Sequence, residues 1–187
     1  MRLFIALNLN KKERQRVHRA ARPLREEELP VRWVEEANLH LTLKFLGEVR
    51  PEQVPAVEEA MVRVGEGTAP FSMALGGFGA FPTIRRPRVL WMGVDASPAL
   101  RCLKQDLEWG LTDCGFEAET RAFHPHMTLG RADPSDGAGV FRGLDQLVST
   151  LDFSAEIPVR TVDLMRSVLS RDGARYARLS SAKLTGC

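Results

Sequence analysis

This chain of 187 residues has few of the residues that build disulfide-rich, metal-binding or membrane proteins. Its three cysteines, Cys102, Cys114 and Cys187, form neither a disulfide framework nor a C-x-x-C metal spacing. No apolar run is long enough to cross a bilayer, and the first residues lack the long apolar region and cleavage site of a signal peptide. These absences favour a reducing compartment, so we expect a cytoplasmic protein without membrane contact.

The chain also has little net charge, because 26 Lys+Arg are balanced by 24 Asp+Glu and leave a formal net charge of +2. A field this weak excludes a protein that coats nucleic acid indiscriminately. Any nucleic-acid contact is therefore expected to be local. The 44% of hydrophobic residues and the length are typical of one soluble domain, or of two small lobes that share a core.

Apolar periodicity in the first half predicts strands alternating with helices. The alternation of Leu3, Ile5, Leu7 and Leu9 indicates a strand, and Asn10 with Glu13 forms a capping box for a helix whose apolar stripe reaches Leu24. Further along, we expect strands at 31–35 and 39–46, a helix over 51–65, a strand at 71–75 and a loop at 76–82.

The second half repeats this series. A strand at 88–94 is followed by Ser97-Pro98, which is typical of a helix start, and Gly115 marks the end of that helix. We then expect strands at 116–121 and 126–131, a helix near 140–151, and strands near 153–157, 159–170 and 174–184, the last two joined by a hairpin turn at 171–173.

One offset relates the two halves. His126 lies 86 positions after His40, and the same shift carries Leu3 onto Val89 in the strand that opens the second half. A strand, helix, strand and His-bearing strand therefore recur in register. We predict a single domain over 1–187 of the α+β class, with sequence repeats at roughly 1–80 and 87–170 that form two pseudo-symmetric lobes.

A histidine and a threonine two residues apart occupy the equivalent place in each half: His40 with Thr42, and His126 with Thr128. Residues i and i+2 of a strand share a face, so each pair is expected to point one way while the hydrophobic residues between them point into the core. A lone pair of this kind is usually a half-exposed polar face. Two in matched positions favour one shared functional cleft.

This set of side chains suits chemistry at phosphorus. In-line displacement needs one group that takes a proton from the attacking water and another that protonates the leaving oxygen. Two histidines that titrate near neutrality can hold these complementary states, and threonine hydroxyls can donate to the non-bridging oxygens. Such a reaction requires no metal, cofactor or covalent intermediate, and a strained cyclic phosphate fits it best.

The paired H-x-T-x motifs resemble those of the two-histidine phosphoesterases. The segments HLTLKFLGEV, FPTIRRPRVLW, HPHMTLGR and GARY, together with Trp33, are similar to the bacterial RNA 2′,3′-cyclic phosphodiesterase branch, historically called 2′-5′ RNA ligases. The resemblance implies a bilobal α+β fold, in which two lobes of antiparallel sheet with flanking helices surround a central cleft. It also implies hydrolysis of a terminal 2′,3′-cyclic phosphate to a 2′-phosphomonoester.

The family's pattern makes His40 the proton donor to the 3′ leaving oxygen and His126 the acceptor from water. The residues alone leave this assignment open. Arg131, three positions after Thr128, corresponds to a basic residue that family members often have, and we expect it to reach a phosphate from the strand end. Two interpretations are open for the basic cluster of Arg85, Arg86 and Arg88. It contacts the RNA backbone, or it is a solvated basic turn.

Three phenylalanines are candidates for stacking a base. Strict alternation points Phe45 away from Thr42, so we assign it to the core, whereas Phe78 and Phe81 in the glycine-rich segment are the better stacking candidates. Among the other residues, His124 is expected at the rim rather than in a zinc site, His18 in solvent, and Arg175 and Tyr176 in structural roles.

The predicted partners are RNA 3′ ends or nucleoside 2′,3′-cyclic phosphates, and a monomer suffices because one chain carries both motifs. Two alternatives stay open at this point. One is 2′-5′ RNA ligation, the reverse reaction with an RNA hydroxyl in place of water. The other is a non-catalytic protein that binds RNA ends or nucleotides. The intact histidine pair argues against the second, because binding alone needs no acid–base couple.

Overall fold

The structure is a computed structural model, and it describes residues 1–137, 139–170 and 173–187. Within these residues, nine strands form one sheet in which every pairing is antiparallel. The order across the sheet is β7-β4-β5-β6-β3-β1-β8-β9, and β2 pairs with β6. The strands are β1 (Arg2–Asn8), β2 (Val31–Trp33), β3 (His40–Glu48), β4 (Phe71–Thr83), β5 (Arg86–Val94), β6 (His126–Ala132), β7 (Ser154–Val159), β8 (Thr161–Ser170) and β9 (Gly173–Lys183).

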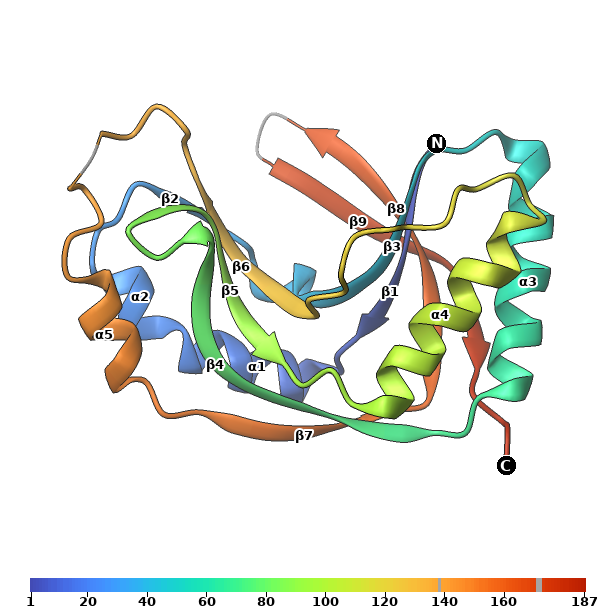
Figure 1. The fold of residues 1–187 in the computed structure, drawn as a ribbon. Helices are drawn as coiled ribbons and strands as arrows, with labels where there is room; N and C mark the ends of the chain where they lie inside the picture. The colour runs from blue at the N-terminus through green and yellow to red at the C-terminus, as the bar shows by residue number, and fades with distance from the viewer. Residues whose placement is uncertain (138, 171–172) are drawn as a thin grey trace.

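The helices gather at the two ends of this sheet (Figure 1). Helices α3 and α4 lie side by side at one end, and α1, α2 and α5 lie at the other. The helices are α1 (Lys11–Ala20), α2 (Arg22–Glu26), α3 (Val54–Gly67), α4 (Pro98–Thr112) and α5 (Leu144–Thr150), with short 3-10 turns η1 (Glu36–Asn38) and η2 (Pro51–Gln53). In the described part of the chain, no helix has the length and apolar character needed to span a membrane.

The offset of 86 residues can be compared with the positions of the strands. Shifting β1 by 86 residues gives 88–94 within β5, shifting β3 reaches β6, and shifting β4 covers most of β8. However, β8 pairs with β1, whereas β4 pairs with β5. Each half of the sheet therefore combines strands from both halves of the chain. The two halves meet in the middle, where β3 and β6 share the pair Leu41 and Met127.

The main core lies between the sheet and the helices. Leu3, Ile5 and Leu7 of β1 face it, and so do the four leucines at positions 100, 103, 107 and 111 of α4. The opposite face of β1 carries a separate small cluster, in which Phe4, Ala6 and Met165 pack with Tyr176. The Phe4 ring lies 5.0 Å from that of His40, so this second cluster is on the face that also carries the histidines.

The helix starts follow local sequence, as predicted. Asn10 accepts from the Glu13 N–H at 2.9 Å while its own N–H donates to the Glu13 carboxylate, and Ser97 caps α4. The first helical stretch differs from the prediction because it breaks at Ala21 into α1 and α2. Pro23 explains the break, since it lacks an N–H and its ring clashes with a continuing helix.

Two other predicted elements are wrong, and a third begins later than predicted. The expected loop at 76–82 is part of β4, which absorbs its glycines in an irregularity between Leu75 and Phe78, where Gly77 has a φ of 73°. The expected strand at 116–121 has no regular structure. The helix expected near 140–151 begins only at Leu144, after Gly143 with a φ of 88°. The hairpin turn predicted at 171–173 lies outside the described residues except for Gly173.

Candidate active site

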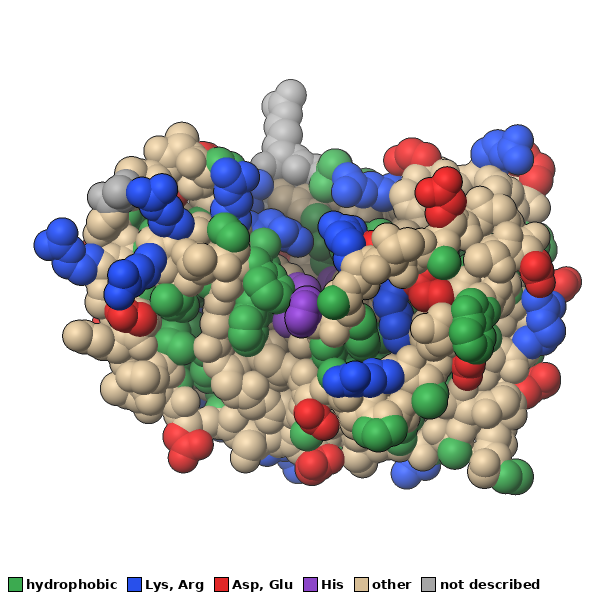
Figure 2. All heavy atoms as spheres, in the orientation of Figure 1, with side chains coloured by type: hydrophobic (Ala, Val, Ile, Leu, Met, Phe, Trp, Pro, Cys, Tyr) green, Lys and Arg blue, Asp and Glu red, His purple; other side chains and the backbone are tan. Residues whose placement is uncertain are grey.

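The two His-x-Thr motifs meet at the centre of the sheet. Because β3 and β6 are antiparallel and Leu41 lies opposite Met127, Thr42 lies alongside His126 and Thr128 lies alongside His40. Leu41 and Met127 point into the core and are fully buried, so the four polar side chains point to the other face, where each is half-buried. Figure 2 shows histidine in the middle of the molecule's face, with hydrophobic and basic side chains around it.

Both histidines are held by the same backbone contact. The Nδ1–H of His40 donates to the Asn38 carbonyl at 2.7 Å, and that of His126 donates to the His124 carbonyl at 2.8 Å. A carbonyl oxygen only accepts, so Nδ1 carries the hydrogen and Nε2 is the nitrogen that exchanges a proton. His40 Nε2 lies 3.0 Å from the Thr42 hydroxyl, which donates to it when the ring is neutral.

Aromatic rings enclose both imidazoles. The Phe4 ring lies 5.0 Å from the His40 ring, and Tyr176 meets His40 edge-on at 5.1 Å. In the other half, Phe81 meets His126 edge-on at 5.0 Å. Burial lowers the pKa of His40 below its ordinary value, and the positive charge of Arg131 lowers it further against the opposing hydrogen bond to Asn38. Burial therefore favours the neutral form of His40 in the free protein.

A β-bulge places Arg131 on the same face as Thr128. Strand β5 pairs Trp91 with Thr128 and Leu90 with Gly130, so Leu129 is an extra residue and the alternation shifts by one. Gly130 consequently lies on the core side with Leu90, and the exposed Arg131 emerges on the histidine side. Regular alternation could not have placed Arg131 there.

The same kind of irregularity makes the core assignment of Phe45 wrong. The β1 residues Ala6 and Ile5 pair with Thr42 and Lys44 of β3. Leu43 is therefore an extra residue of β3, between Thr42 and Lys44. Lys44 then points into the core and Phe45 points to the histidine side, where 67% of its surface is exposed. The Phe45 ring lies 6.1 Å from that of Phe4.

The other residues that the sequence suggested for the site lie in different places. Phe81 lies beside His126, whereas Phe78 pairs with the buried Met92 and packs against the main core, away from the histidines. Arg85, Arg86 and Arg88 are exposed along the β4–β5 hairpin. The side chain of His124 is exposed at the rim, and its carbonyl is the group that orients His126.

Sequence reasoning missed one contact of this site and the burial of a histidine outside it. Tyr176, expected to be structural, packs against His40, and only the GARY segment pointed to it. His18 is half-buried rather than solvated, with Nδ1 3.4 Å from the Arg25 guanidinium and 3.9 Å from the Glu36 carboxylate. Burial, followed by the Arg25 charge, lowers the pKa of His18.

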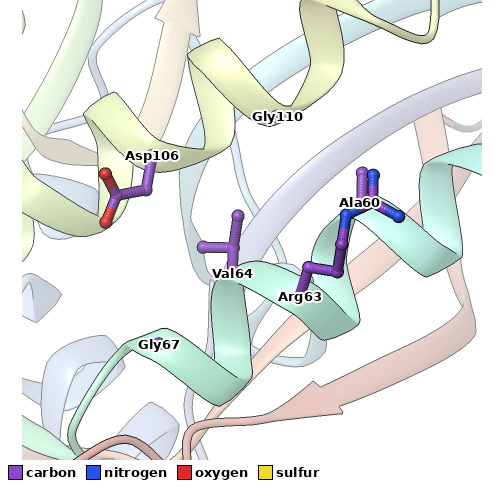
Figure 3. Close-up of a pocket in the computed structure, with 6 residues that line it drawn as sticks. All are labelled: Ala60, Arg63, Val64, Gly67, Asp106 and Gly110. Carbon is purple, nitrogen blue, oxygen red and sulfur yellow. The ribbon is translucent and has the colours of Figure 1, made fainter.

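Two hollows lie outside this site. One runs between α3 and α4 (Figure 3), where its lining residues are Ala60, Arg63, Val64, Gly67, Asp106 and Gly110. The other lies near α1 and α5 and includes Arg16, Arg19 and Phe153. Neither contains a histidine or one of the paired threonines. Among the described residues, no group of three or more His, Cys, Asp or Glu is arranged to hold a metal ion.

Comparison with known proteins agrees with this geometry. A model of the LigT-like phosphoesterases matches residues 7–91. An RNA 2′,3′-cyclic phosphodiesterase of Thermotoga maritima is 32% identical over 187 residues, which cover 100% of this chain and 97% of that protein. The chain belongs to the LigT-like phosphoesterase family. A second relative, the RNA 2′,3′-cyclic phosphodiesterase of Aeropyrum pernix, is 36% identical over 83% of this chain and 87% of its own length.

Solved structures share the fold of this LigT-like phosphoesterase. The protein TT0787 of Thermus thermophilus matches with a TM-score of 0.82 and 30% identity over 100% of this chain and 99% of that one. Escherichia coli LigT complexed with 3′-AMP matches with a TM-score of 0.74 and 30% identity over 98% of both chains. The predicted bilobal α+β fold with an antiparallel sheet and flanking helices is thus confirmed.

Proposed function

We propose that this LigT-like phosphoesterase hydrolyses the 2′,3′-cyclic phosphate at an RNA 3′ end to a 2′-phosphomonoester. The observation that carries the proposal is the symmetric histidine pair. Each imidazole has its Nδ1–H on the carbonyl two residues earlier and a threonine from the facing strand alongside. Nε2 is thereby the nitrogen of each imidazole that can exchange a proton with a group bound between them, and that of His40 also lies 3.0 Å from the Thr42 hydroxyl.

In the proposed reaction, His126 takes a proton from water as the water oxygen forms a bond to phosphorus. The bond from phosphorus to O3′ breaks, and His40 gives a proton to that oxygen, so that the 2′-phosphate remains. Burial favours the neutral form of His40 in the free protein, so this role requires His40 to gain a proton when the anionic substrate binds. Thr42 and Thr128 donate to the non-bridging oxygens, and Arg131 offsets the charge of the phosphate.

No step in this scheme uses a metal or a cofactor, so we expect EDTA to leave turnover unchanged. One chain supplies both motifs, so a monomer suffices. The substrates this site would accept are RNA 3′ ends and nucleoside 2′,3′-cyclic phosphates. The monomeric state and the cytoplasmic location stay predictions.

The decisive experiment incubates the protein with a nucleoside 2′,3′-cyclic phosphate, with and without EDTA, and locates the phosphate in the product. We expect a 2′-phosphate, whereas a 3′-phosphate would overturn the assigned leaving group. His40→Ala and His126→Ala should each abolish turnover while circular dichroism shows an intact fold. His18→Ala, a half-buried histidine outside the site, is the matched control and should retain full activity.

The acid and base roles can be separated with a second substrate. A phosphodiester with a p-nitrophenolate leaving group needs little help from an acid, so the variant that lacks the acid should recover activity on it. We expect recovery for His40→Ala and none for His126→Ala, and the reverse pattern would exchange the two roles. Incubation of cyclic-phosphate ends with RNA that carries a free hydroxyl, followed by product analysis, separates hydrolysis from ligation.

A further inference from the structure

We propose that Arg32 is a substrate-binding residue that holds a second phosphate, the one on O5′ of the terminal nucleoside. In RNA, this phosphate links the terminal nucleotide to the rest of the strand. The proposal rests on the proposed function and extends it, because it assigns a place for the RNA backbone as well as for the cyclic phosphate. It predicts that RNA 3′ ends bind more tightly than nucleoside cyclic phosphates that lack the second phosphate.

The first observation is the face of the sheet on which Arg32 emerges. Strand β2 pairs with β6, and Arg32 lies directly opposite Arg131. The side chains of Val31 and Trp33 pack against the main core, and a Cβ at Gly130 would meet both of them. Because successive residues of a strand point to opposite faces, Arg32 points to the histidine face, beside Arg131.

The second observation is that two like charges lie side by side. Residues directly opposite each other in an antiparallel pair have Cβ atoms about 4.5–5.5 Å apart, and like charges at such positions destabilise the sheet. Arg32 and Arg131 are both exposed, and neither forms an ion pair with another described residue. An anionic ligand that contacts both guanidinium groups would turn this repulsion into binding energy.

A nearby carboxylate, that of Asp133, does not cancel the repulsion. Asp133 Oδ1 accepts from the Ser135 hydroxyl at 2.7 Å and from the Ser135 N–H at 2.9 Å. These hydrogen bonds are the main cause of the lowered pKa of Asp133, and the Arg32 charge contributes less. Arg32 is therefore available to a ligand.

The third observation is the order of the site residues along β6. His126, Thr128 and Arg131 follow one another on the same face. Arg32 adds a second positive charge at the end of β6 that lies away from His126. In the proposed reaction, the cyclic phosphate is bound between His40 and His126 with Arg131 beside it. The next phosphate of the strand then meets Arg32, so we expect the RNA to leave the site over β2.

The test uses one nucleoside 2′,3′-cyclic phosphate with and without a 5′-phosphate, so that the two substrates differ only by the second phosphate. In the wild type, the 5′-phosphorylated substrate should have the lower KM. Arg32→Gln removes one charged contact, so it should raise KM for this substrate roughly ten-fold and leave KM for the other within about 2-fold. For both substrates kcat should stay within about 2-fold. Arg32→Lys keeps the charge and should retain part of the difference.

Two other arginines provide the controls. Arg131→Gln should raise KM for both substrates, because Arg131 is assigned to the cyclic phosphate. Arg63→Gln removes an equal charge from an exposed position on α3 and should leave both KM values unchanged. With an RNA oligonucleotide that ends in a cyclic phosphate, the slope of log KM against log salt concentration should be shallower by about 0.7 in Arg32→Gln, since one phosphate contact is lost.

Urea unfolding separates this role from a structural one. Without a ligand, Arg32→Gln removes a repulsion and should be at least as stable as the wild type. An equal rise of KM for both substrates, or an unchanged KM for the 5′-phosphorylated one, would overturn the proposal. Failure of the proposed function is a different result, because the wild type would then hydrolyse neither substrate. The Kd values of the two compounds, measured by calorimetric titration, would in that case provide the same comparison.

Discussion

Replacing Lys44 by methionine removes a positive charge from the interior of the protein. The bulge in β3 turns Lys44 inward, where its ammonium donates to the Glu108 carboxylate and, at 2.7 Å, to the Glu117 carbonyl. Only 6% of the Lys44 side chain and 4% of the Glu108 side chain are exposed. Glu108 also accepts from the Lys104 ammonium and, at 3.0 Å, from the Glu119 N–H.

The expected loss of stability follows from these partners. Removing one member of a buried ion pair typically costs about 3–5 kcal/mol. Glu108 keeps Lys104 and the Glu119 N–H in Lys44→Met, so we expect the lower end, about 3 kcal/mol. For a chain of this length, that loss lowers the Tm by roughly 6–12 °C.

Urea unfolding at pH 7 measures this change. The control is Arg22→Met, which breaks the exposed pair of Arg22 and Glu26, whose side chains are 69% and 59% exposed, and should cost less than about 0.5 kcal/mol. A change within about 1 kcal/mol in Lys44→Met would refute the reasoning.

The pH dependence gives a second measurement of the same cluster. Burial alone would raise the pKa of Glu108, but hydrogen bonds from Lys104, Lys44 and the Glu119 N–H outweigh it and hold the pKa below its ordinary value of 4.5. A carboxylate with a depressed pKa stabilises the fold above the unfolded-state pKa and loses this effect as the pH falls through the folded-state pKa. The stability advantage of the wild type over Glu108→Gln should therefore shrink below pH 4.5.

Three further predictions concern the site and the sheet. Burial is the main cause of the lowered pKa of His40, so Tyr176→Ala should raise that pKa toward 6.5, as measured by NMR titration of the imidazole. Arg131→Gln should raise the same pKa by removing a nearby positive charge, and should raise KM for cyclic phosphates about ten-fold by removing a charged contact. Gly130→Ala should cost about 1–3 kcal/mol in urea unfolding, because its Cβ would lie 2.4 Å from Val31 Cγ1.

Each of these three predictions would be contradicted by a specific result. A pKa of His40 that does not move in Tyr176→Ala would mean that the tyrosine ring does not desolvate the imidazole. Unchanged KM in Arg131→Gln would remove Arg131 from the proposed phosphate site. Gly137→Ala is the control for Gly130→Ala, since a Cβ at Gly137 meets nothing within 4 Å, and equal stability of the two variants would contradict the packing argument.

Most of the local structure was predictable because its causes are local. The Asn10 and Ser97 caps, and the strands that carry His40 and His126, depend on residues within a few positions of each other. The expected strand at 116–121 failed for the opposite reason. Its backbone is bound to charged side chains from β3 and α4 rather than to a neighbouring strand, and no local pattern reveals those partners.

The face on which a side chain emerges was predictable only as far as the strands stay regular. Strict alternation places Thr42 with His40 and Thr128 with His126, but it assigns Phe45 to the core and gives Arg131 no place on the histidine face. One extra residue in each strand reverses both assignments. A bulge depends on how the strand pairs with its neighbours, which periodicity within a single strand does not report.

By itself, the sequence determined that two equivalent His-x-Thr strands exist, because alternation and a constant offset are properties of the chain alone. Tertiary structure decided how the strands are exchanged between the two halves, which rings enclose His40, and that Phe45 and Arg131 lie on the histidine face of the sheet. Tertiary structure also lowers the pKa of His40. This pKa depends on burial and on charges that only folding brings near the imidazole.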